Sequence, residues 1–337
     1  MKTSNNATIR DVARRAGVSV ATISRYLNNT APLAAETAER VRLAMEELNF
    51  SPHPAARNLA TRRTNTIGLV LQEIGGDYYT PLLRGIEAAS GEAGFDLLIH
   101  STRTRVPGNN PRRPLNEHNT DGLLVFTDAL DTPELTRLNS MGFPVVLMHQ
   151  SAPEGLSIPV VAIDNYSGAY RIIDHLVTAH NRSRIVFLRG PEHNEDSEAR
   201  EKGYREALIN HKIKPGPALV TRGGFESESA FNAMKDLLAR DIRFDAVFTG
   251  DDDSAIGVLE ALKQAGLRVP EDVAVAGFDD SIFARLLSPP LSTVRAPIEE
   301  VGCEAVSQLI RLIRGLEAEP VSVIPTEIVL RRSCGCF

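Results

Sequence analysis

Two short helices separated by only three residues fit the sequence between Thr8 and Leu27, and this connection constrains the fold most strongly. Thr8-Ile9-Arg10-Asp11 matches a capping box, in which a Thr hydroxyl accepts a backbone N–H and an acidic side chain reaches back to the cap residue. We expect a first helix from Ile9 to Ala16, ended by Gly17 in a left-handed turn. A second helix is expected from about Val20 to Leu27. So short a connection forces the two helices to cross steeply.

A third helix, from about Ala35 to Leu48, is expected to complete a small three-helix core. Small Ala13 lets the first two helices approach closely at their crossing, and Ser19 can cap the second helix. Ala34 stands where a hydroxyl cap is usual for the third helix, at a cost of ~1 kcal/mol. The residues of the third helix expected to be buried are Val41, Leu43, Met45 and Leu48.

Charge is unevenly spread along the chain. Residues 1–63 contain ten Lys and Arg against five Asp and Glu, whereas the other residues contain 27 against 38. A basic head on an acidic body suggests a nucleic-acid-binding module joined to a domain with another task.

The segment from Thr8 to Asn29, TIRDVARRAGVSVATISRYLNN, closely resembles the headpiece of the LacI/GalR family. The resemblance implies a helix-turn-helix that binds double-stranded operator DNA, with the start of its second helix facing base edges in the major groove. Val20 and Ala21 can touch thymine methyl groups, and Arg25 can form a bidentate contact with guanine. Arg10, Ser19, Thr22 and Ser24 are better placed for phosphates, and Thr8 and Asn28 complete the expected DNA contacts.

A short stretch from Ala55 to Ala60 can form a helix but is too short to be stable alone in water. In the family that the chain resembles, the matching segment folds on the operator, pairs with its dimer mate and wedges a leucine into the minor groove. Leu59 is the matching leucine, Ala56 would let the two hinge helices touch, and Arg57 could contact phosphate or the groove wall. The alternative is a solvated linker.

From Asn65 onward short strands alternate with helices, which predicts an α/β domain with parallel sheets. The first set of expected elements comprises strands at 66–71, 95–100 and 122–127 and a helix at 82–93. The second set comprises strands at 185–188, 246–249 and 273–277 and helices at about 200–210 and 254–264. The repetition predicts two similar halves.

This body resembles the ligand domain of the LacI/GalR family, which is itself similar to periplasmic sugar-binding proteins. The implied fold is α + α/β: a headpiece at 1–53, a hinge at 54–63 and a two-lobed ligand domain at 64–337. Lobe 1 is expected at about 64–163 and 294–322, and lobe 2 at about 164–293 and 323–337. Prolines in 103–119 predict that a helix regular in the family is short or lost here. The resemblance rests on the segments 82–86, 121–123, 164–165, 189–191, 200–204, 251–252, 277–280 and 289–293.

Open α/β sheets bind ligands beyond the carboxyl ends of their strands. The resemblance implies Arg200, Asp251 and Asp279 as effector contacts, and an arginine with carboxylates can hydrogen-bond the vicinal hydroxyls of a sugar. From the other half we add Gln72, Tyr78, Tyr79, Phe126 and His149, whose aromatic rings could stack on a sugar face.

Three alternatives stay open at this site. Tyr78 and Tyr79 could instead pack in the core or at a dimer interface, and His149 could be a satisfied structural group. Asp280 is expected to cap a helix at 281–287 rather than to touch ligand.

Other features bound the class of protein. We find no nucleotide-binding loop, nucleophile elbow, metalloprotease motif or dinucleotide fingerprint, so we expect neither an enzyme nor a cofactor. The polar N-terminus and the lack of a long apolar run predict a cytoplasmic protein without a membrane role. Cys303, Cys334 and Cys336 form no disulfide framework, and the last two have no partner pair for zinc, so we expect an inert tail, with redox or metal chemistry as the alternative.

Together these features predict a sequence-specific DNA-binding transcription regulator, a repressor by analogy, that acts as a homodimer on a pseudopalindromic operator. A small-molecule effector is expected to control it allosterically. A sugar fits the polar site best, although the resemblance also permits a purine. The alternative is a ligand sensor or carrier without operator-specific DNA binding. The sequence leaves open the operator, the effector, and whether ligand induces or corepresses.

Overall fold

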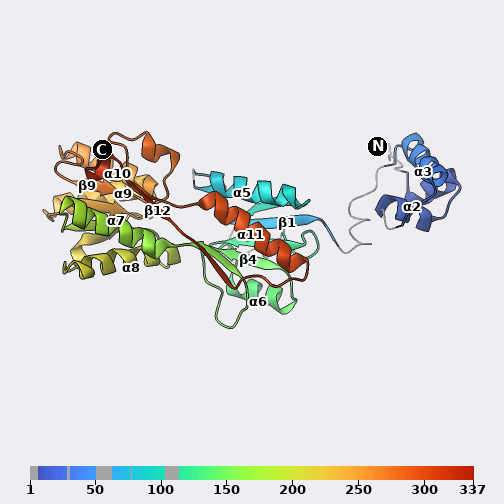
Figure 1. The fold of residues 1–337 in the computed structure, drawn as a ribbon, viewed down its shortest axis with the longest axis horizontal. Coiled ribbons are helices and arrows are strands. Elements are labelled where there is room, and N and C mark those ends of the chain that lie inside the picture. Colours follow the sequence, from blue (N-terminus) through green and yellow to red (C-terminus); the bar gives the residue numbers. More distant parts are fainter. Residues whose placement is uncertain (1–6, 29–30, 51–62, 77, 103–113) are drawn as a thin grey trace, which may run out of the picture. The chain divides into compact units, whose positions relative to one another are not determined.

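A computed structural model describes residues 7–28, 31–50, 63–76, 78–102 and 114–337. It divides into two compact units, Met1–Thr64 and Asn65–Phe337 (Figure 1). The predicted hinge residues Ala56, Arg57 and Leu59 lie outside the described residues, as does most of the proline-containing segment 103–119.

The first unit contains the three predicted helices, α1 (Ile9–Ala16), α2 (Val20–Asn28) and α3 (Ala35–Glu47). The capping box is present, because Thr8 N donates to Asp11 Oδ2 at 3.0 Å and Thr8 Oγ1 accepts from Asp11 N. Gly17 ends α1 at φ 63°, and Ala34 provides no side-chain cap for α3, both as predicted. The buried core consists of Val12, Ala13, Ala16, Ile23, Val41 and Ala44.

One prediction for α3 is wrong, because Leu43 is 50% exposed. Val41, Ala44 and Leu48 repeat at intervals of three and four residues and so share one face, whereas Leu43 points to the other side of the helix. Met45 and Leu48 are half-buried rather than buried.

The first lobe of Asn65–Phe337 is built on a parallel six-stranded sheet with the order β11-β5-β4-β3-β1-β2. Helices α5 and α11 cover one face of this sheet and α6 covers the other (Figure 1). Because both faces are covered, β3 and β4 are buried along their whole length. The elements are β1 (Thr66–Leu71), α5 (Tyr79–Glu92), β2 (Asp96–Ser101), β3 (Gly122–Phe126), α6 (Thr132–Ser140), β4 (Val145–Met148), β5 (Val160–Ile163), α11 (Ile298–Ile313) and β11 (Val321–Ile324).

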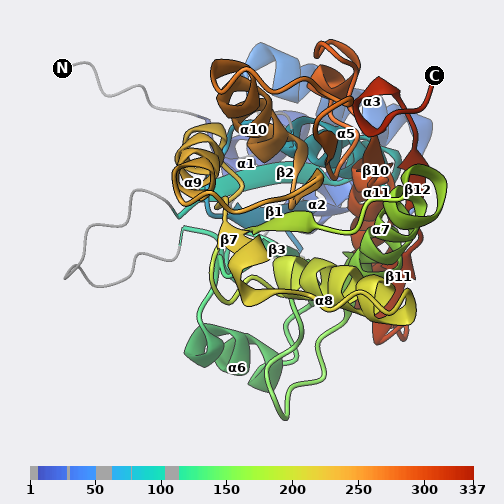
Figure 2. The same ribbon diagram turned by 90° about the vertical axis from the view of Figure 1, so that its left-hand side faces the viewer.

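The second lobe repeats this architecture on a parallel four-stranded sheet, β7-β6-β8-β9. Figure 2 shows the helices around the sheet, with α9 and α10 on one side and α7 and α8 on the other. Ile185 and Phe187 pack with α7 and α8, whereas Val186 and Leu188 pack with α9 and α10, as the two-residue period of a strand requires. The elements are α7 (Asn165–His180), β6 (Ile185–Arg189), α8 (Glu195–Asn210), η1 (Pro217–Leu219), β7 (Val220–Arg222), α9 (Ser227–Ala239), β8 (Ala246–Thr249), α10 (Asp252–Gln264), β9 (Ala274–Ala276), η2 (Ile282–Arg285) and η3 (Arg332–Cys334).

The chain crosses between the lobes after β5, after β10 (Thr293–Arg295) and before β12 (Glu327–Val329), and β10 and β12 pair antiparallel. Strand β11 pairs with β5, so its final residues, Val323 and Ile324, belong to the first-lobe sheet. The last crossing therefore comes slightly later than the expected boundary after residue 322. Thr326 Oγ1 donates to Asp164 O at 3.0 Å, so two of the crossing segments are hydrogen-bonded together. No helix in the described residues is long and apolar enough to cross a membrane.

Close helix packing in the second lobe gives a stability prediction. A Cβ on Gly257 of α10 would lie 1.9 Å from the backbone oxygen of Ser227, so Gly257→Ala must push α9 and α10 apart. We expect a loss of about 1–3 kcal/mol in the free energy of unfolding, measured by urea denaturation. Gly91→Ala in α5 is the control, because its Cβ would enter open space and should stabilise the helix by about 0.5–1 kcal/mol. Equal effects of the two substitutions would contradict this explanation.

Candidate functional sites

The residues predicted to contact bases lie on one exposed side of α2. Val20, Ala21 and Arg25 are exposed, whereas Ile23 on the opposite side is fully buried in the three-helix core. Burial of Ile23 fixes the rotation of the helix, so these three side chains are presented outward together.

The other residues predicted to contact DNA are partly engaged within the headpiece. Ser19 Oγ accepts from Thr22 N at 3.1 Å and lies 2.9 Å from Thr22 Oγ1, so it caps α2. The Thr8 hydroxyl donates to Asp11 at 2.6 Å. Arg10 is exposed and Ser24 is half-buried. A capping hydroxyl keeps further hydrogen-bonding capacity. The side chain of Asn28 lies outside the described residues.

Sequence reasoning missed Arg40, which holds the turn of the helix-turn-helix. Its Nε donates to Ala16 O at 3.1 Å and its Nη2 to Gly17 O at 3.0 Å. These bonds satisfy carbonyls at the C-terminus of α1 and set a positive charge where the helix dipole favours one. A contact across 24 positions leaves no local pattern in the sequence.

A cleft of about 1600 Å³ lies between the two lobes of Asn65–Phe337. Its walls come largely from segments that follow parallel strands, which is where α/β sheets form their ligand sites. Seven of the predicted effector residues line this cleft: Gln72, Tyr78, Tyr79, Phe126, Arg200, Asp251 and Asp279. His149 does not line it.

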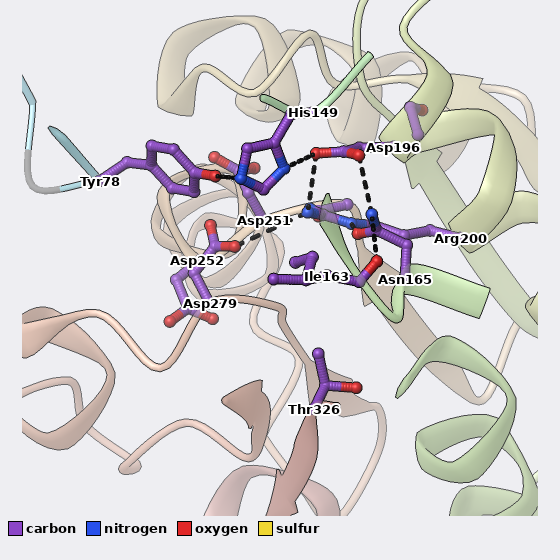
Figure 3. Close-up of polar contacts among 12 residues, drawn as sticks. Tyr78, His149, Ile163, Asn165, Asp196, Arg200, Asp251, Asp252, Asp279 and Thr326 are labelled. Atoms are coloured by element: carbon purple, nitrogen blue, oxygen red, sulfur yellow. Dashed lines mark hydrogen bonds and ion pairs between the residues drawn. The ribbon is translucent and has the colours of Figure 1, made fainter. Parts of the chain in front are cut away.

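Arg200 of α8 is the cation at the centre of the polar contacts in Figure 3. Its side chain is only 3% exposed, and its Nε donates to Asn165 Oδ1 at 2.8 Å. Nη1 donates to Gly250 O. Nη2 lies 4.0 Å from Asp196 and 3.8 Å from Asp279, too far for a good hydrogen bond to either carboxyl group. The guanidinium is therefore held rigidly with its Nη2 edge directed at acidic groups.

Asp279 combines an unusual backbone with an unsatisfied side chain. Its φ of 115° lies in a region that favours glycine. Among the described residues Oδ1 is buried without a hydrogen-bond partner. Burial raises the pKa of Asp279 well above its usual value; Arg200 opposes this rise, and Asp252 and Asp251 add to it. Strain and a missing donor at one residue are features of ligand sites.

Two further acids stand beside Asp279, at the start of α10. Asp251 caps this helix by accepting from Ser254 N at 3.1 Å. Asp252 accepts from Thr293 Oγ1 at 2.6 Å and from Ser281 N at 2.7 Å. Burial raises the pKa of Asp251 to about 6 and that of Asp252 to about 7.

These raised pKa values predict that stability depends on pH. The contribution of Asp252 is complete below its ordinary pKa of 3.8 and is lost as the pH rises through about 7, because the folded state favours the protonated form. We expect Asp252→Asn to raise the melting temperature by on the order of 5 °C at pH 8 and by little at pH 5. The control is Asp253→Asn, the same charge change at an exposed neighbour. A gain that is equal at both pH values would contradict the prediction.

A chain of hydrogen bonds runs from the first lobe to the second (Figure 3). Tyr78 Oη lies 3.1 Å from His149 Nε2, and His149 Nδ1 lies 2.8 Å from Asp196 Oδ2. Asp196 Oδ1 accepts from Asn165 Nδ2 at 2.8 Å, and Asn165 binds Arg200. Burial would raise the pKa of Asp196, but His149 and Arg200 more than offset this and lower it. Asp196 is thus an ionised acceptor, and His149 Nδ1 donates to it.

Aromatic rings form the first-lobe wall near this chain. Tyr78, Tyr79 and Phe126 pack edge to face with ring centroids 5.5–6.0 Å apart. His149 is 1% exposed behind Tyr78. The geometry favours the structural alternative for His149, whereas the two tyrosines both line the cleft and pack against each other.

Asp280 does not cap the following segment, which corrects a prediction. It accepts from Arg295 Nε at 2.8 Å and from Arg331 Nη2 at 2.6 Å. The segment that follows is the short 3-10 helix η2, and it has no side-chain cap. Asp280 has a φ of 58°, whereas a residue that caps a helix usually has an extended backbone. Its carboxyl group instead forms ion pairs with two arginines from the crossing segments.

Several functional candidates were missed from the sequence. Asp196 precedes Arg200 by four residues, so helical spacing could have identified it. Asn165 and Asp252 belong to quoted motifs without having been assigned a role. Phe225, which follows β7, left no signal; its ring centroid lies 5.5 Å from Arg200 Cζ.

The helix-turn-helix and the two-lobed cleft domain together define a DNA-binding regulator with a separate ligand domain. Residues 8–53 match the model for bacterial regulatory proteins of the lacI family, and residues 173–334 match that for a periplasmic binding protein-like domain. The chain is 34% identical to the HTH-type transcriptional regulator CelR of Thermobifida fusca, over 99% of this chain and 100% of that one. The chain therefore belongs to the LacI family of bacterial regulatory proteins, which are transcription regulators.

Solved structures agree over nearly the whole chain. A CelR–cellobiose complex is 30% identical, with a TM-score of 0.72, and covers 97% of this chain and 99% of its own. A lac repressor dimer bound to operator and the anti-inducer ONPF is 25% identical, with a TM-score of 0.84, and covers 98% of this chain and 99% of its own.

Proposed function

We propose that the protein is a transcription repressor that binds a pseudopalindromic operator as a homodimer and responds to an uncharged sugar held between its lobes. The observation that supports it most is the buried pair of Arg200 and Asp279, separated by 3.8 Å, with the Asp279 Oδ1 atom lacking a donor. A sugar hydroxyl can donate to Asp279 while its oxygen accepts from Arg200. Both side chains would then have the hydrogen-bond partner that each lacks.

The charge around the cleft favours a neutral ligand over a phosphorylated one. Of the residues that the structure describes, ten Asp and Glu line it against five arginines, and Arg200 is the arginine that acts on Asp196, Asp251 and Asp279. A phosphate group would face repulsion from the ionised members of this set. The apolar rings of Tyr79 and Phe126 offer a surface for a sugar ring, and the cellobiose in the CelR complex supports this class.

We assign the acids to binding and structure rather than to catalysis. Asp251 caps α10, and both oxygens of Asp252 accept hydrogen bonds from the protein. Neither is arranged as a free acid or base beside a nucleophile. The protein is accordingly proposed not to be an enzyme.

The hydrogen-bonded chain offers a route for allostery. Tyr78 and His149 belong to the first lobe, and Asp196 and Arg200 to the second, so a ligand that binds Arg200 acts on groups that join the lobes. A sugar that binds one angle between the lobes more tightly than another would favour that conformation. Operator affinity would then change by a coupling free energy of about 1–3 kcal/mol. On the DNA side we propose that Val20, Ala21 and Arg25 contact bases and that Leu59 of the hinge enters the minor groove. Such a regulator would act in the cytoplasm.

A ligand panel tests the proposal. Isothermal titration of the full chain with cellobiose, glucose, a pentose, glucose 6-phosphate and purine bases should show one uncharged sugar binding with one site per chain. The phosphorylated form of that sugar should bind at least about tenfold more weakly. Binding of a purine, or of the phosphate ester in preference, would contradict the assignment of the cleft.

A further inference from the structure

Two histidines and two cysteines that lie far apart in the sequence converge in the second lobe, outside the cleft. His175 and His180 belong to α7, and Cys334 and Cys336 lie at the C-terminal end of the chain. One possible metal-ligand atom from each of the four lies within 4.8 Å of the others. Cys334 is buried and the other three are half-buried, so the group is sheltered but can be reached from solvent.

The distances between these atoms fit tetrahedral coordination. The Cys336 Sγ atom lies 3.3 Å from Nε2 of His175 and 3.3 Å from Nε2 of His180. Cys334 Sγ lies 3.9 Å from Nε2 of His175. Zinc bonds of ~2.3 Å to sulfur and ~2.0–2.1 Å to nitrogen would separate sulfur from nitrogen by roughly 3.5 Å in a tetrahedron. The observed values lie on either side of this distance.

The backbone is shaped to bring the four side chains together. His175 and His180 are five residues apart, a spacing that a regular α-helix would not align. At the end of α7, however, Asn181 N donates to Leu176 O, five residues back, and the rings of His175 and His180 lie with their centroids 5.0 Å apart.

Glycine is required between the two cysteines. Gly335 has a φ of 107°, and a Cβ there would lie 3.0 Å from the His180 ring. The C-terminal turn can therefore approach α7 closely only with glycine at this position.

We propose that His175, His180, Cys334 and Cys336 form a structural zinc site. Cys2His2 is a ligand set typical of closed tetrahedral zinc sites, and the sulfur ligands disfavour magnesium and calcium. Each thiol would release one proton to become a thiolate, so Zn²⁺ with two thiolates and two neutral imidazoles is a neutral unit. The metal would join the C-terminal turn to α7 across about 160 residues of chain, which is the kind of long-range link that stabilises a fold.

The test uses the full-length protein, purified under reducing conditions and freed of metal with a chelator. We expect one Zn²⁺ per chain by elemental analysis after reconstitution, and a rise in melting temperature on the order of 5 °C at saturating zinc. Substituted Co²⁺ should give the visible absorption bands of a tetrahedral thiolate complex.

Two variants give the comparison. Cys336→Ser should weaken zinc affinity by more than about 100-fold and remove the cobalt bands. Cys303→Ser, the third cysteine, lies outside the cluster and should change neither. Zinc binding that Cys336→Ser leaves intact, no binding at micromolar zinc, or a Cys334–Cys336 disulfide in the reduced preparation would each overturn the proposal. None of these readouts involves DNA or sugar, so failure here is separable from failure of the proposed function.

Discussion

Replacing Arg200 with methionine is expected to abolish sugar binding, with a loss of affinity of at least about 100-fold by calorimetry. Methionine keeps much of the apolar volume but removes the donors at Nε and Nη2. It also leaves Asn165 Oδ1 and Gly250 O without their donor and removes the positive charge beside Asp196, so the free energy of unfolding should fall by about 3–5 kcal/mol. Operator affinity without sugar should change far less than the response to sugar.

Arg200→Lys separates charge from geometry at the same position. Lysine keeps the positive charge for Asp196 and Asp279 but lacks the planar fork, so stability should largely return while sugar affinity stays low. Arg205→Met is the matched control on the same helix, because Arg205 is half-exposed and pairs with Glu201. Near-normal sugar affinity in Arg200→Lys would contradict a specific role for the guanidinium.

The second large effect is expected in the headpiece. Arg25→Ala should weaken operator binding by ~1–3 kcal/mol per half-site, because the exposed guanidinium is proposed to read guanine directly. Two half-sites in a dimer make the total loss ~2–6 kcal/mol, which is about 30-fold or more in affinity. The loss of affinity is measured by fluorescence anisotropy, with the operator and with an operator altered at the guanine.

Arg42→Ala provides the control for this experiment. Arg42 of α3 is also exposed in part but is paired with Glu39 and Glu46. Arg42→Ala removes the same charge as Arg25→Ala. It should therefore weaken binding to operator and to non-specific DNA only modestly and to the same extent. Equal losses from Arg25→Ala and Arg42→Ala on both DNAs would contradict base reading by α2.

Local signals in the sequence predicted the headpiece helices and part of the ligand domain, because such signals depend on neighbouring residues. The capping box at Thr8 and Asp11 and the glycine turn at Gly17 define α1 without reference to the rest of the chain. Thr66–Leu71 is a continuous apolar run and was predicted at its observed bounds, whereas the buried strands Val145–Met148 and Val160–Ile163 were not predicted. The helices predicted at 82–93 and about 200–210 begin earlier in the structure, at Tyr79 and Glu195. Family motifs then identified Arg200, Asp251 and Asp279 as lining one cleft.

Contacts between distant residues could not be predicted this way. Asp280 was expected to cap because a cap is a local device, yet its partners Arg295 and Arg331 come from other segments. The Cys334 and Cys336 pair lacked a partner pair in the sequence, and the structure sets two histidines of α7 beside it. The error at Leu43 is of another kind, because the helical period of Val41 and Ala44 already places Leu43 on the exposed side of α3.

The most direct test of the central claim is operator binding by the full-length protein with and without the sugar identified by calorimetry. A labelled pseudopalindromic sequence from upstream of its own gene would be titrated at several salt concentrations. We predict tight, salt-sensitive binding that the sugar shifts by about 5- to 150-fold in wild type and leaves unchanged in Arg200→Lys. Weak binding that is indifferent to DNA sequence and to sugar would contradict the account and favour a ligand sensor without operator recognition.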